Sequence, residues 1–555
     1  MKKTIGLIAV IVALWLPRSQ ALDRFVTPDE PKWLMRSANF YLALAQHDLG
    51  STYQKEHPGV TAMWAGLAGF LRGYPQYVRL GPGQMDRPPQ LERYLENHGV
   101  EALSLLATSR RFIVIAIVIA LSLAYLSAVR LVGFLPALAG FLLLAFDPFL
   151  IALSRLLHLD GLVSALMLLS LLAWLNYLYN GRRFVDLLLS AVSAGLSWLT
   201  KSPALFLLPF LGLTCLVEVV RLWLGQRQIT WAEPRKLLRS GLIWAAIAVV
   251  VFTLLWPAMW VDPIGTVRQI FSAAASYASE GHDSAIFFNH AIYPAGIDDW
   301  RFYPVSYLWR ATPVTLAGLI ALIVSLLLPR RFPLSRQQRL TTLYLGLFAL
   351  LFTVFMSLGA KKFDRYLLPV FAPLDLLAGL GWTAVISPLF KPSSGKQAHS
   401  PQPVIWLSII GLAGLAGLVA IQALSAAQTF PYYFTYYNPL AGGSARASQV
   451  MMIGWGEGLD QAARYLNDKP DADKLKVTSW YADGPFSYIF NGETIQKDLP
   501  ASPGELPRAD YLIIYAHQWQ RQLPSREFLD YYAAQEPEKV VKIDGLEYAR
   551  IYRLR

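Results

Sequence analysis

Two adjacent carboxylates, Asp29 and Glu30, follow shortly after the first apolar segment of the chain. A carboxylate can serve as a general base when it lies within about 2.6–3.2 Å of the proton that it removes. A second carboxylate can orient the first or help to bind a metal ion. The same two residues, preceded by Pro28, also suit the first turn of a helix. The local sequence therefore leaves a catalytic and a helix-capping interpretation open.

Cationic side chains occupy three short junctions between apolar segments. Arg155, Lys201 and the cluster Lys361, Lys362 and Arg365 all fall on the side that the charge distribution predicts to be outside the cytoplasm. Cations at membrane depth are costly, so we expect an anion to bind there, although snorkelling to lipid headgroups would also accommodate them. Two separated cationic junctions suit a pyrophosphate-like group or a lipid phosphate that enters from the bilayer.

Other polar residues near these junctions allow several interpretations. Glu56 and His57 could bind a divalent metal ion or a substrate hydroxyl, or could be ordinary loop residues. His158 and Asp160 follow an arginine, and an Arg–Asp pair here either fixes a helical hairpin or serves the site. Polar and aromatic residues alternate in the segment 261–311, which is typical of a carbohydrate site but also of a folded loop.

The elements that must position these residues are apolar segments of about 20 residues, the length that spans roughly 30 Å of hydrocarbon. The 555-residue chain is 55% hydrophobic and 15% charged, which excludes intrinsic disorder and argues against one large soluble globule. Its single cysteine, Cys215, excludes intramolecular disulfides and zinc sites built on thiolates. The first apolar segment could be a removable secretory signal. We predict about eleven membrane helices, near 4–20, 111–132, 134–153, 160–179, 185–200, 203–224, 241–260, 312–329, 340–359, 366–388 and 404–427.

The distribution of Lys and Arg predicts which loops face the cytoplasm. With a cytoplasmic N-terminus, most of these cations fall in the short inner loops, among them a linker at 391–402. The net charge of +12 then needs no nucleic-acid partner to explain it. Three long polar segments face the other side: 21–109, 261–311 and 428–555.

The last of these segments differs in character from the rest of the chain. Its pattern predicts helices at 458–466 and 528–534, and strands at 475–480 and 511–515. We therefore predict an α-helical polytopic membrane protein in two parts. These are a transmembrane domain at 1–427 and a small extracytoplasmic α/β domain at 428–555.

Taken in order, the motifs resemble the protein O-mannosyltransferase family (glycosyltransferase family 39) of the GT-C superfamily. They are also similar to the related transferases that add aminoarabinose to lipid A. The chain departs from the pattern at Gly59 and Ser202, and 261–311 is too short for a MIR domain, which leaves the acceptor class open. The motifs that carry the resemblance are Asp29-Glu30, Glu56-His57-Pro58, Arg155 to Asp160, Thr200-Lys201-Ser202-Pro203, Gly281-His282, Phe302-Tyr303-Pro304, Arg365-Tyr366-Leu367-Leu368-Pro369 and Gly454-Trp455-Gly456.

This resemblance implies a GT-C membrane enzyme that moves one sugar, with inversion, from a polyprenyl-phosphate carrier to an acceptor outside the cytoplasm. The acceptor would be a protein hydroxyl or a cell-envelope glycolipid or glycan, and the enzyme would lie in the plasma or inner membrane. The implied roles are a catalytic Asp29 supported by Glu30; donor-phosphate contacts from Arg155, Lys201, Lys362 and Arg365; substrate contacts from His158, Asp160, Tyr303 and Tyr366; and a divalent metal ion held by Glu56 with His57 or His282.

Two other functions would use the same residues. A secondary transporter or flippase explains many spans and cations at membrane depth, but such proteins usually show repeated halves, and the sequence shows no internal repeat. A glycolipid-binding protein without catalytic activity would need the same binding groups. Only a test of activity separates that protein from an enzyme.

Overall fold

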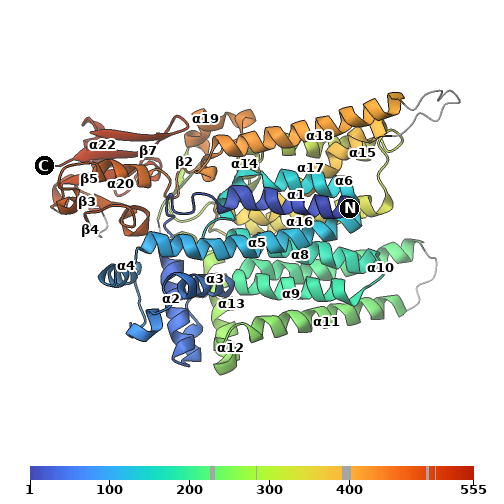
Figure 1. Ribbon diagram of the computed structural model, residues 1–555, viewed down its shortest axis with the longest axis horizontal. Helices are drawn as coiled ribbons and strands as arrows, with labels where there is room; N and C mark the ends of the chain where they lie inside the picture. The colour runs from blue at the N-terminus through green and yellow to red at the C-terminus, as the bar shows by residue number, and fades with distance from the viewer. Residues whose placement is uncertain (226–231, 283, 391–401, 496–498, 507, 555) are drawn as a thin grey trace.

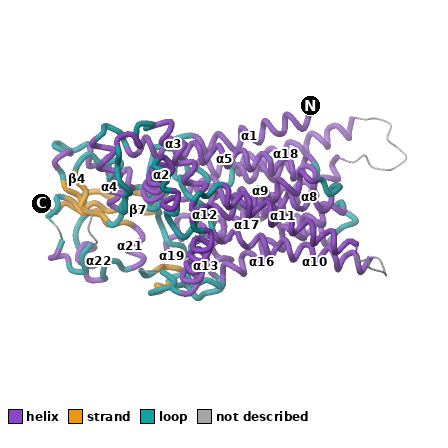
Figure 2. The backbone as a smooth tube through the Cα atoms, turned by 90° about the horizontal axis from the view of Figure 1, so that it is seen from below, coloured by secondary structure: helices purple, strands orange, loops and turns teal. Residues whose placement is uncertain are grey.

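A helical bundle and a smaller C-terminal region with a sheet make up the chain (Figure 1). The computed structural model describes residues 1–225, 232–282, 284–390, 402–495, 499–506 and 508–554. The N-terminus lies at one end of the bundle, and the C-terminal region lies at the opposite end (Figures 1 and 2). The predicted linker 391–402 falls, except for Gln402, outside the described residues.

Within the described residues, seven helical segments are long and apolar enough to cross a membrane. A further pair, α14 (Phe302–Arg310) and α15 (Pro313–Leu327), is bent by 112° and would make an eighth crossing. The chain is therefore a multi-pass membrane protein. The seven are α5 (Ala102–Val132), α8 (Asp160–Tyr179), Ser202–Leu224 with α10 (Leu207–Gly225), α11 (Ala232–Leu254), α16 (Arg336–Ser357), Asp364–Leu389 with α17 (Leu368–Ile386), and Trp406–Gln428 of α18 (Gln402–Gln428).

Three of the eleven predicted spans form helices that fall short of this test. The first is α1 (Lys2–Ser19), which contains three cations in 18 residues. The segment 134–153 is divided into α6 (Phe134–Ala145) and α7 (Pro148–Leu153), because a new helix begins after Asp147, whose carboxylate accepts a hydrogen bond from the Leu150 amide. The third is α9 (Phe184–Thr200), whose 17 residues reach only about 26 Å at 1.5 Å per residue.

The first helix packs as part of the bundle core. Arg18 on α1 is completely buried, and its guanidinium donates to Ser154 Oγ at 2.7 Å and to the Ala145 carbonyl at 2.9 Å. A Cβ added at Gly6 would lie 2.5 Å from the Tyr125 hydroxyl, so α1 and α5 approach closely there. Removal of α1 would take away a helix that packs in the core and donates these buried hydrogen bonds, which favours an anchor over a removable signal.

Short helices and a hairpin lie between the bundle and the sheet. In Figure 1, α2 runs across the direction of the long bundle helices at this junction. These elements carry several of the residues that meet at the site described below. They are α2 (Glu30–Ala45), α3 (Val60–Gly73), α4 (Pro88–Asn97), α12 (Ala258–Val261), α13 (Pro263–Ser279), β1 (Ile286–Phe288) and β2 (Ala291–Tyr293).

The C-terminal region contains a mixed five-stranded sheet of order β4-β3-β5-β7-β6. β3 pairs in parallel with β4 and β5, whereas β7 pairs antiparallel with β5 and β6. The predicted strands at 475–480 and 511–515 and the helices at 458–466 and 528–534 are confirmed as β3, β5, α20 and α22. The elements are β3 (Lys476–Ser479), β4 (Glu493–Ile495), β5 (Tyr511–Tyr515), β6 (Lys539–Ile543) and β7 (Leu546–Arg553), with α19 (Gly443–Val450), α20 (Leu459–Asn467), α21 (Ala516–Arg521) and α22 (Arg526–Ala533).

Candidate active site

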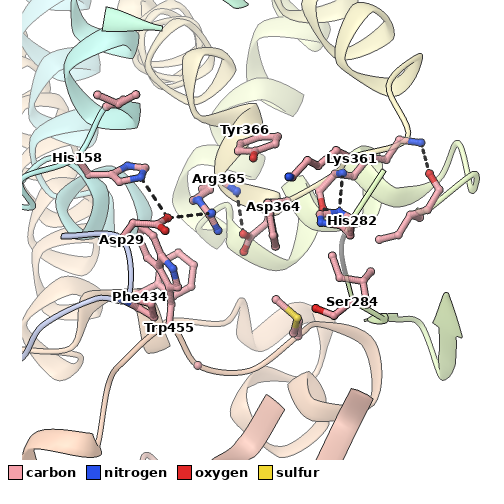
Figure 3. Close-up of a pocket in the computed structure, with 18 of the residues that line it drawn as sticks. Asp29, His158, His282, Ser284, Lys361, Asp364, Arg365, Tyr366, Phe434 and Trp455 are labelled. Atoms are coloured by element: carbon pink, nitrogen blue, oxygen red, sulfur yellow. Dashed lines mark hydrogen bonds and ion pairs between the residues drawn. The ribbon is translucent and has the colours of Figure 1, made fainter. Parts of the chain in front are cut away.

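A cavity of about 420 Å³ opens where the bundle meets the C-terminal region (Figure 3). This volume lies within the range of small-molecule sites. The lining is strongly cationic, with eight Lys and Arg residues against Asp29 and Asp364. Such an excess of positive charge favours an anionic ligand. The eight cations are Lys32, Arg36, Lys55, Lys201, Lys361, Lys362, Arg365 and Arg521.

Asp29 points into this cavity rather than capping its helix. It is the residue before α2, yet among the described residues no α2 backbone amide donates to its carboxylate. Its Oδ2 atom lies 3.5 Å from His158 Nε2 and 3.5 Å from Arg365 Nη2 (Figure 3). The side chain retains 30% of its exposure, which leaves it open to a second reactant. This geometry argues against the side-chain capping interpretation.

His158 lies between two carboxylates. Its Nδ1 atom is 3.3 Å from Asp160 Oδ2, and its Nε2 atom is 3.5 Å from Asp29 Oδ2. Burial lowers the pKa of His158, but the two carboxylates raise it more, so the net shift is upward. Burial raises the pKa of Asp29, but the His158 hydrogen bond and the charge of Arg365 outweigh it and hold that pKa below its ordinary value. Asp29 is therefore ionised at neutral pH.

Asp160 lies outside the cavity lining and holds two of the cations that line it. It begins α8, and its Oδ1 atom lies 2.5 Å from Lys201 Nζ. Its Oδ2 atom lies 3.6 Å from Arg365 Nε. Lys201 joins α9 to the following 3₁₀ turn, and its ammonium lies 4.1 Å from the centre of the Tyr366 ring. The predicted residues His158, Lys201, Arg365 and Tyr366 all line the cavity, and Asp160 holds the first three together.

Arg365 is positioned by its chain neighbours and by aromatic rings. It lies in the 3₁₀ turn Asp364–Leu367, where Asp364 accepts a hydrogen bond from the Arg365 amide at 2.8 Å. The other Asp364 oxygen accepts from Arg310 Nε at 2.8 Å, which ties the turn to α14. The Arg365 guanidinium lies 4.1 Å from the Phe363 ring and 4.4 Å from the Trp455 ring. Cation–π contacts of this kind restrict the guanidinium to one orientation.

Besides Asp160 and Glu56, three of the residues implied by the resemblance lie outside the described lining of the cavity, each for an identifiable reason. Glu30 is completely buried and is neutralised by Arg110, whose Nε donates to Glu30 Oε1 at 2.7 Å. Arg155 donates to the backbone carbonyls of Gln20 and Ala21. Tyr303 is completely buried in α14. In this geometry Glu30 and Arg155 position the segment before Asp29 instead of facing the reactants.

The three candidate metal ligands do not form a ligand set. The nearest partner of Glu56 is Lys55, at 2.5 Å. His57 Nδ1 lies 3.2 Å from Ser202 Oγ, and His282 Nε2 lies 3.1 Å from the Lys362 amide nitrogen. No group of three His, Cys, Asp or Glu residues meets in the part of the chain that the structure describes. Burial, together with the charge of neighbouring lysines, lowers the pKa of His57 to about 3 and that of His282 to about 4.

Several residues of the cavity were not predicted from the sequence. Lys32 and Arg36 lie three and seven residues after Asp29, on one face of α2, and helical spacing could have identified them. Arg521 comes from α21 and donates to Ser284 Oγ and to a neighbouring carbonyl. No local pattern identifies Arg521, because only the fold brings α21 to the cavity. Lys362 was predicted, and it lines the cavity while its ammonium donates to the Ile297 carbonyl.

The chain is similar to known proteins in its fold and not in its sequence. No protein-family model matches the chain, and no curated protein sequence matches it. ArnT from Cupriavidus metallidurans bound to undecaprenyl phosphate aligns with a TM-score of 0.51 at 13% identity, over 99% of this chain and 97% of that one. The apo structure of the same protein aligns with a TM-score of 0.48 at 14% identity, again over 99% of this chain and 97% of that one. The S. cerevisiae protein O-mannosyltransferase Pmt1–Pmt2 complex bound to the sugar donor aligns with a TM-score of 0.37 at 16% identity. That alignment covers 48% of this chain and 34% of that one. The first of these alignments, which extends over nearly the whole of both chains, shows that this protein shares the fold of ArnT.

Proposed function

We propose that the chain is a glycosyltransferase that moves a sugar from a polyprenyl-phosphate donor to an acceptor on the extracytoplasmic side of the membrane. One observation carries the proposal: an accessible carboxylate, Asp29, lies 3.5 Å from a guanidinium of a cationic cavity at the end of a membrane bundle. A base and an anion-binding group are thereby side by side, as sugar transfer from a phosphate requires. The ArnT structure of the same fold holds undecaprenyl phosphate, which supports this class of donor.

Lys201 and Arg365 are the proposed contacts of the donor phosphate, with Lys362 nearby. The phosphate leaves with the bridging oxygen when the bond from the anomeric carbon to that oxygen breaks. Cations stabilise the negative charge that develops on this oxygen, so the leaving group needs little protonation. At the same time the acceptor hydroxyl attacks the anomeric carbon and gives its proton to Asp29.

Asp29 is the proposed base because Asp160, the other carboxylate of the cluster, is engaged. Lys201 lies 2.5 Å from Asp160, and only 2% of Asp160 is exposed. Retaining glycosidases use two carboxylates that both face the sugar, whereas one free carboxylate supports a single displacement. We therefore propose transfer with inversion. The proposed acceptor is a protein hydroxyl or a cell-envelope glycolipid or glycan.

The proposal is tested by incubation of the purified protein with a panel of polyprenyl-phosphate sugars and with extracytoplasmic acceptors, followed by quantification of free polyprenyl phosphate. Release from at least one donor is expected. A transporter or a catalytically silent binder would leave every donor intact. Uptake of an intact donor into vesicles, without any release of polyprenyl phosphate, would establish the transporter instead.

The pH dependence of transfer should depend on His158. The His158 hydrogen bond lowers the pKa of Asp29, so its replacement should let that pKa rise. The base form of Asp29 exists above its pKa, and His158→Gln should therefore move the acidic limb of kcat/KM to higher pH. A profile from pH 2 to 9 measures this, since the acidic limb of the parent lies below the ordinary range of a carboxyl, with His98→Gln, an exposed histidine at the end of α4, as the control. An unchanged acidic limb in both variants would show that His158 does not tune the base.

We propose that all eleven apolar segments cross the membrane, with α1 retained and with 428–555 as an extracytoplasmic domain. The cations of the inner loops and the burial of Arg18 support this topology. In a Cys215→Ser background, Lys474→Cys should react with an impermeant maleimide in spheroplasts. Arg331→Cys should react only after the membrane is permeabilised. Equal reaction of both cysteines before permeabilisation would contradict the topology.

A further inference from the structure

Among the parts of the C-terminal region that reach the cavity is a short segment, residues 454–458, which lies between α19 and α20. Gly454, Gly456 and Gly458 all have positive φ, at 87°, 108° and 85°, a conformation that residues with a Cβ rarely adopt. A Cβ at Gly456 would lie 2.2 Å from the Val26 carbonyl oxygen. The segment therefore packs tightly against the backbone that leads to Asp29.

Trp455, within this segment, packs against two of the groups that contact Asp29, Arg365 and His158. Its ring centre lies 4.4 Å from the Arg365 guanidinium carbon, and its ring meets the His158 ring edge-to-face at 5.1 Å and 87°. Trp455 is 7% exposed and also packs on Phe434, as Figure 3 shows. One side chain thus restricts both the cation and the imidazole beside the proposed base.

The sheet determines where this tryptophan lies. Tyr515 on β5 is completely buried, and its hydroxyl donates to the Glu457 carbonyl at 2.8 Å. The same hydroxyl accepts from the Gly456 amide at 3.0 Å. The Glu457 carboxylate accepts from the Trp455 amide at 2.6 Å. One hydrogen bond donated and one accepted by the same hydroxyl therefore connect the segment to the sheet, and a third hydrogen bond fixes the Trp455 backbone.

We propose that residues 454–458 form a clamp through which the C-terminal sheet completes the active site. Trp455 is its positioning residue, holding Arg365 and His158 against Asp29, and Tyr515 is the anchor of the clamp. The inference rests on the proposed function, since it assigns the clamp to the same reaction. According to this proposal, the C-terminal region contributes to donor binding as well as to the stability of the fold.

Tyr515→Phe tests the anchor because it removes only the hydroxyl. The matched control is Tyr552→Phe, a buried tyrosine on the opposite face of the same sheet. We expect Tyr515→Phe to lower kcat/KM for the donor about tenfold, mainly through KM, since Arg365 loses its fixed orientation. We also expect phenylglyoxal to modify Arg365 several-fold faster than in the parent, measured by mass spectrometry of the Arg365 peptide. Tyr552→Phe should change neither quantity.

Two substitutions at Trp455 complete the test. Trp455→Phe keeps an aromatic ring over Arg365 and should retain most of the donor affinity, whereas Trp455→Leu should behave like Tyr515→Phe. Parental donor kinetics and parental Arg365 modification in both Tyr515→Phe and Trp455→Leu would overturn the clamp. If Tyr515→Phe does not fold, the clamp is tested by the difference in donor kinetics and in Arg365 modification between Trp455→Phe and Trp455→Leu. Modification of Arg365 needs no turnover, so it tests the clamp even if the parent releases no polyprenyl phosphate and the proposed function fails.

Discussion

Replacement of Asp29 by Asn is expected to lower kcat by about 10²–10⁴-fold while the protein keeps its fold. Loss of a general base has an effect of this size, because the acceptor hydroxyl must then lose its proton to water. Asn is nearly the same size as Asp and remains a good residue at a helix start. The described α2 amides make no hydrogen bond to the Asp29 carboxylate, so little helix stability depends on it. Initial rates of polyprenyl phosphate release at saturating donor measure the effect.

A second carboxylate in the same outer segment provides the control for this variant. Asp48→Asn removes an equal charge from an exposed position before the short 3₁₀ helix Leu49–Thr52, away from the cavity lining of the described residues. It should transfer sugar at the parental rate. Near-parental kcat in a folded Asp29→Asn variant would make Asp29 a structural residue and would remove the proposed mechanism.

Lys201→Met is expected to have the second largest effect, a loss of about 10²-fold in kcat/KM for the donor. A charge-assisted contact to phosphate contributes roughly 1.5–3 kcal/mol, and each 1.4 kcal/mol corresponds to about tenfold. The loss should appear at limiting donor and saturating acceptor. Because Lys201 also neutralises Asp160 at 2.5 Å, the single variant leaves a buried carboxylate with fewer partners.

The double variant Lys201→Met/Asp160→Asn separates the two consequences of that change. It removes the unpaired charge and should regain thermal stability, but it should not regain donor use. Recovery of donor use along with stability would show that Lys201 serves only to neutralise Asp160. Parental donor kinetics in the single variant would exclude Lys201 from the donor site.

The sequence predicts much of the fold because apolar length and strand patterns are local signals. The strand β5, with five buried residues, and the amphipathic helix α20 are examples. Two readable signals were nonetheless missed. Asp147-Pro148 is a helix start that divides one predicted span, and Asp544-Gly545, with φ of 50° and 78°, is the turn of the β6–β7 hairpin.

The cavity residues were easiest to predict where they stand at the ends of apolar segments. Asp29, Lys201 and Arg365 could be selected in this way, since cations and carboxylates at such junctions are unusual. The partners of Glu30 and Arg155 are long-range: Arg110 lies 80 residues from Glu30 along the chain, and the Ala21 carbonyl lies 134 residues from Arg155. Sequence spacing carries no information about such pairs, so it could not show which charges are already satisfied.

The most direct test of the account asks which bond of the donor breaks. A polyprenyl-phosphate sugar is prepared with ¹⁸O in the oxygen that bridges phosphorus and the anomeric carbon, and the products of a single turnover are analysed by mass spectrometry. Attack on the anomeric carbon predicts that all of the label remains in the released polyprenyl phosphate, which is then two mass units heavier. Label in the transferred sugar would mean that the bond from phosphorus to oxygen breaks, and it would contradict sugar transfer with Asp29 as base.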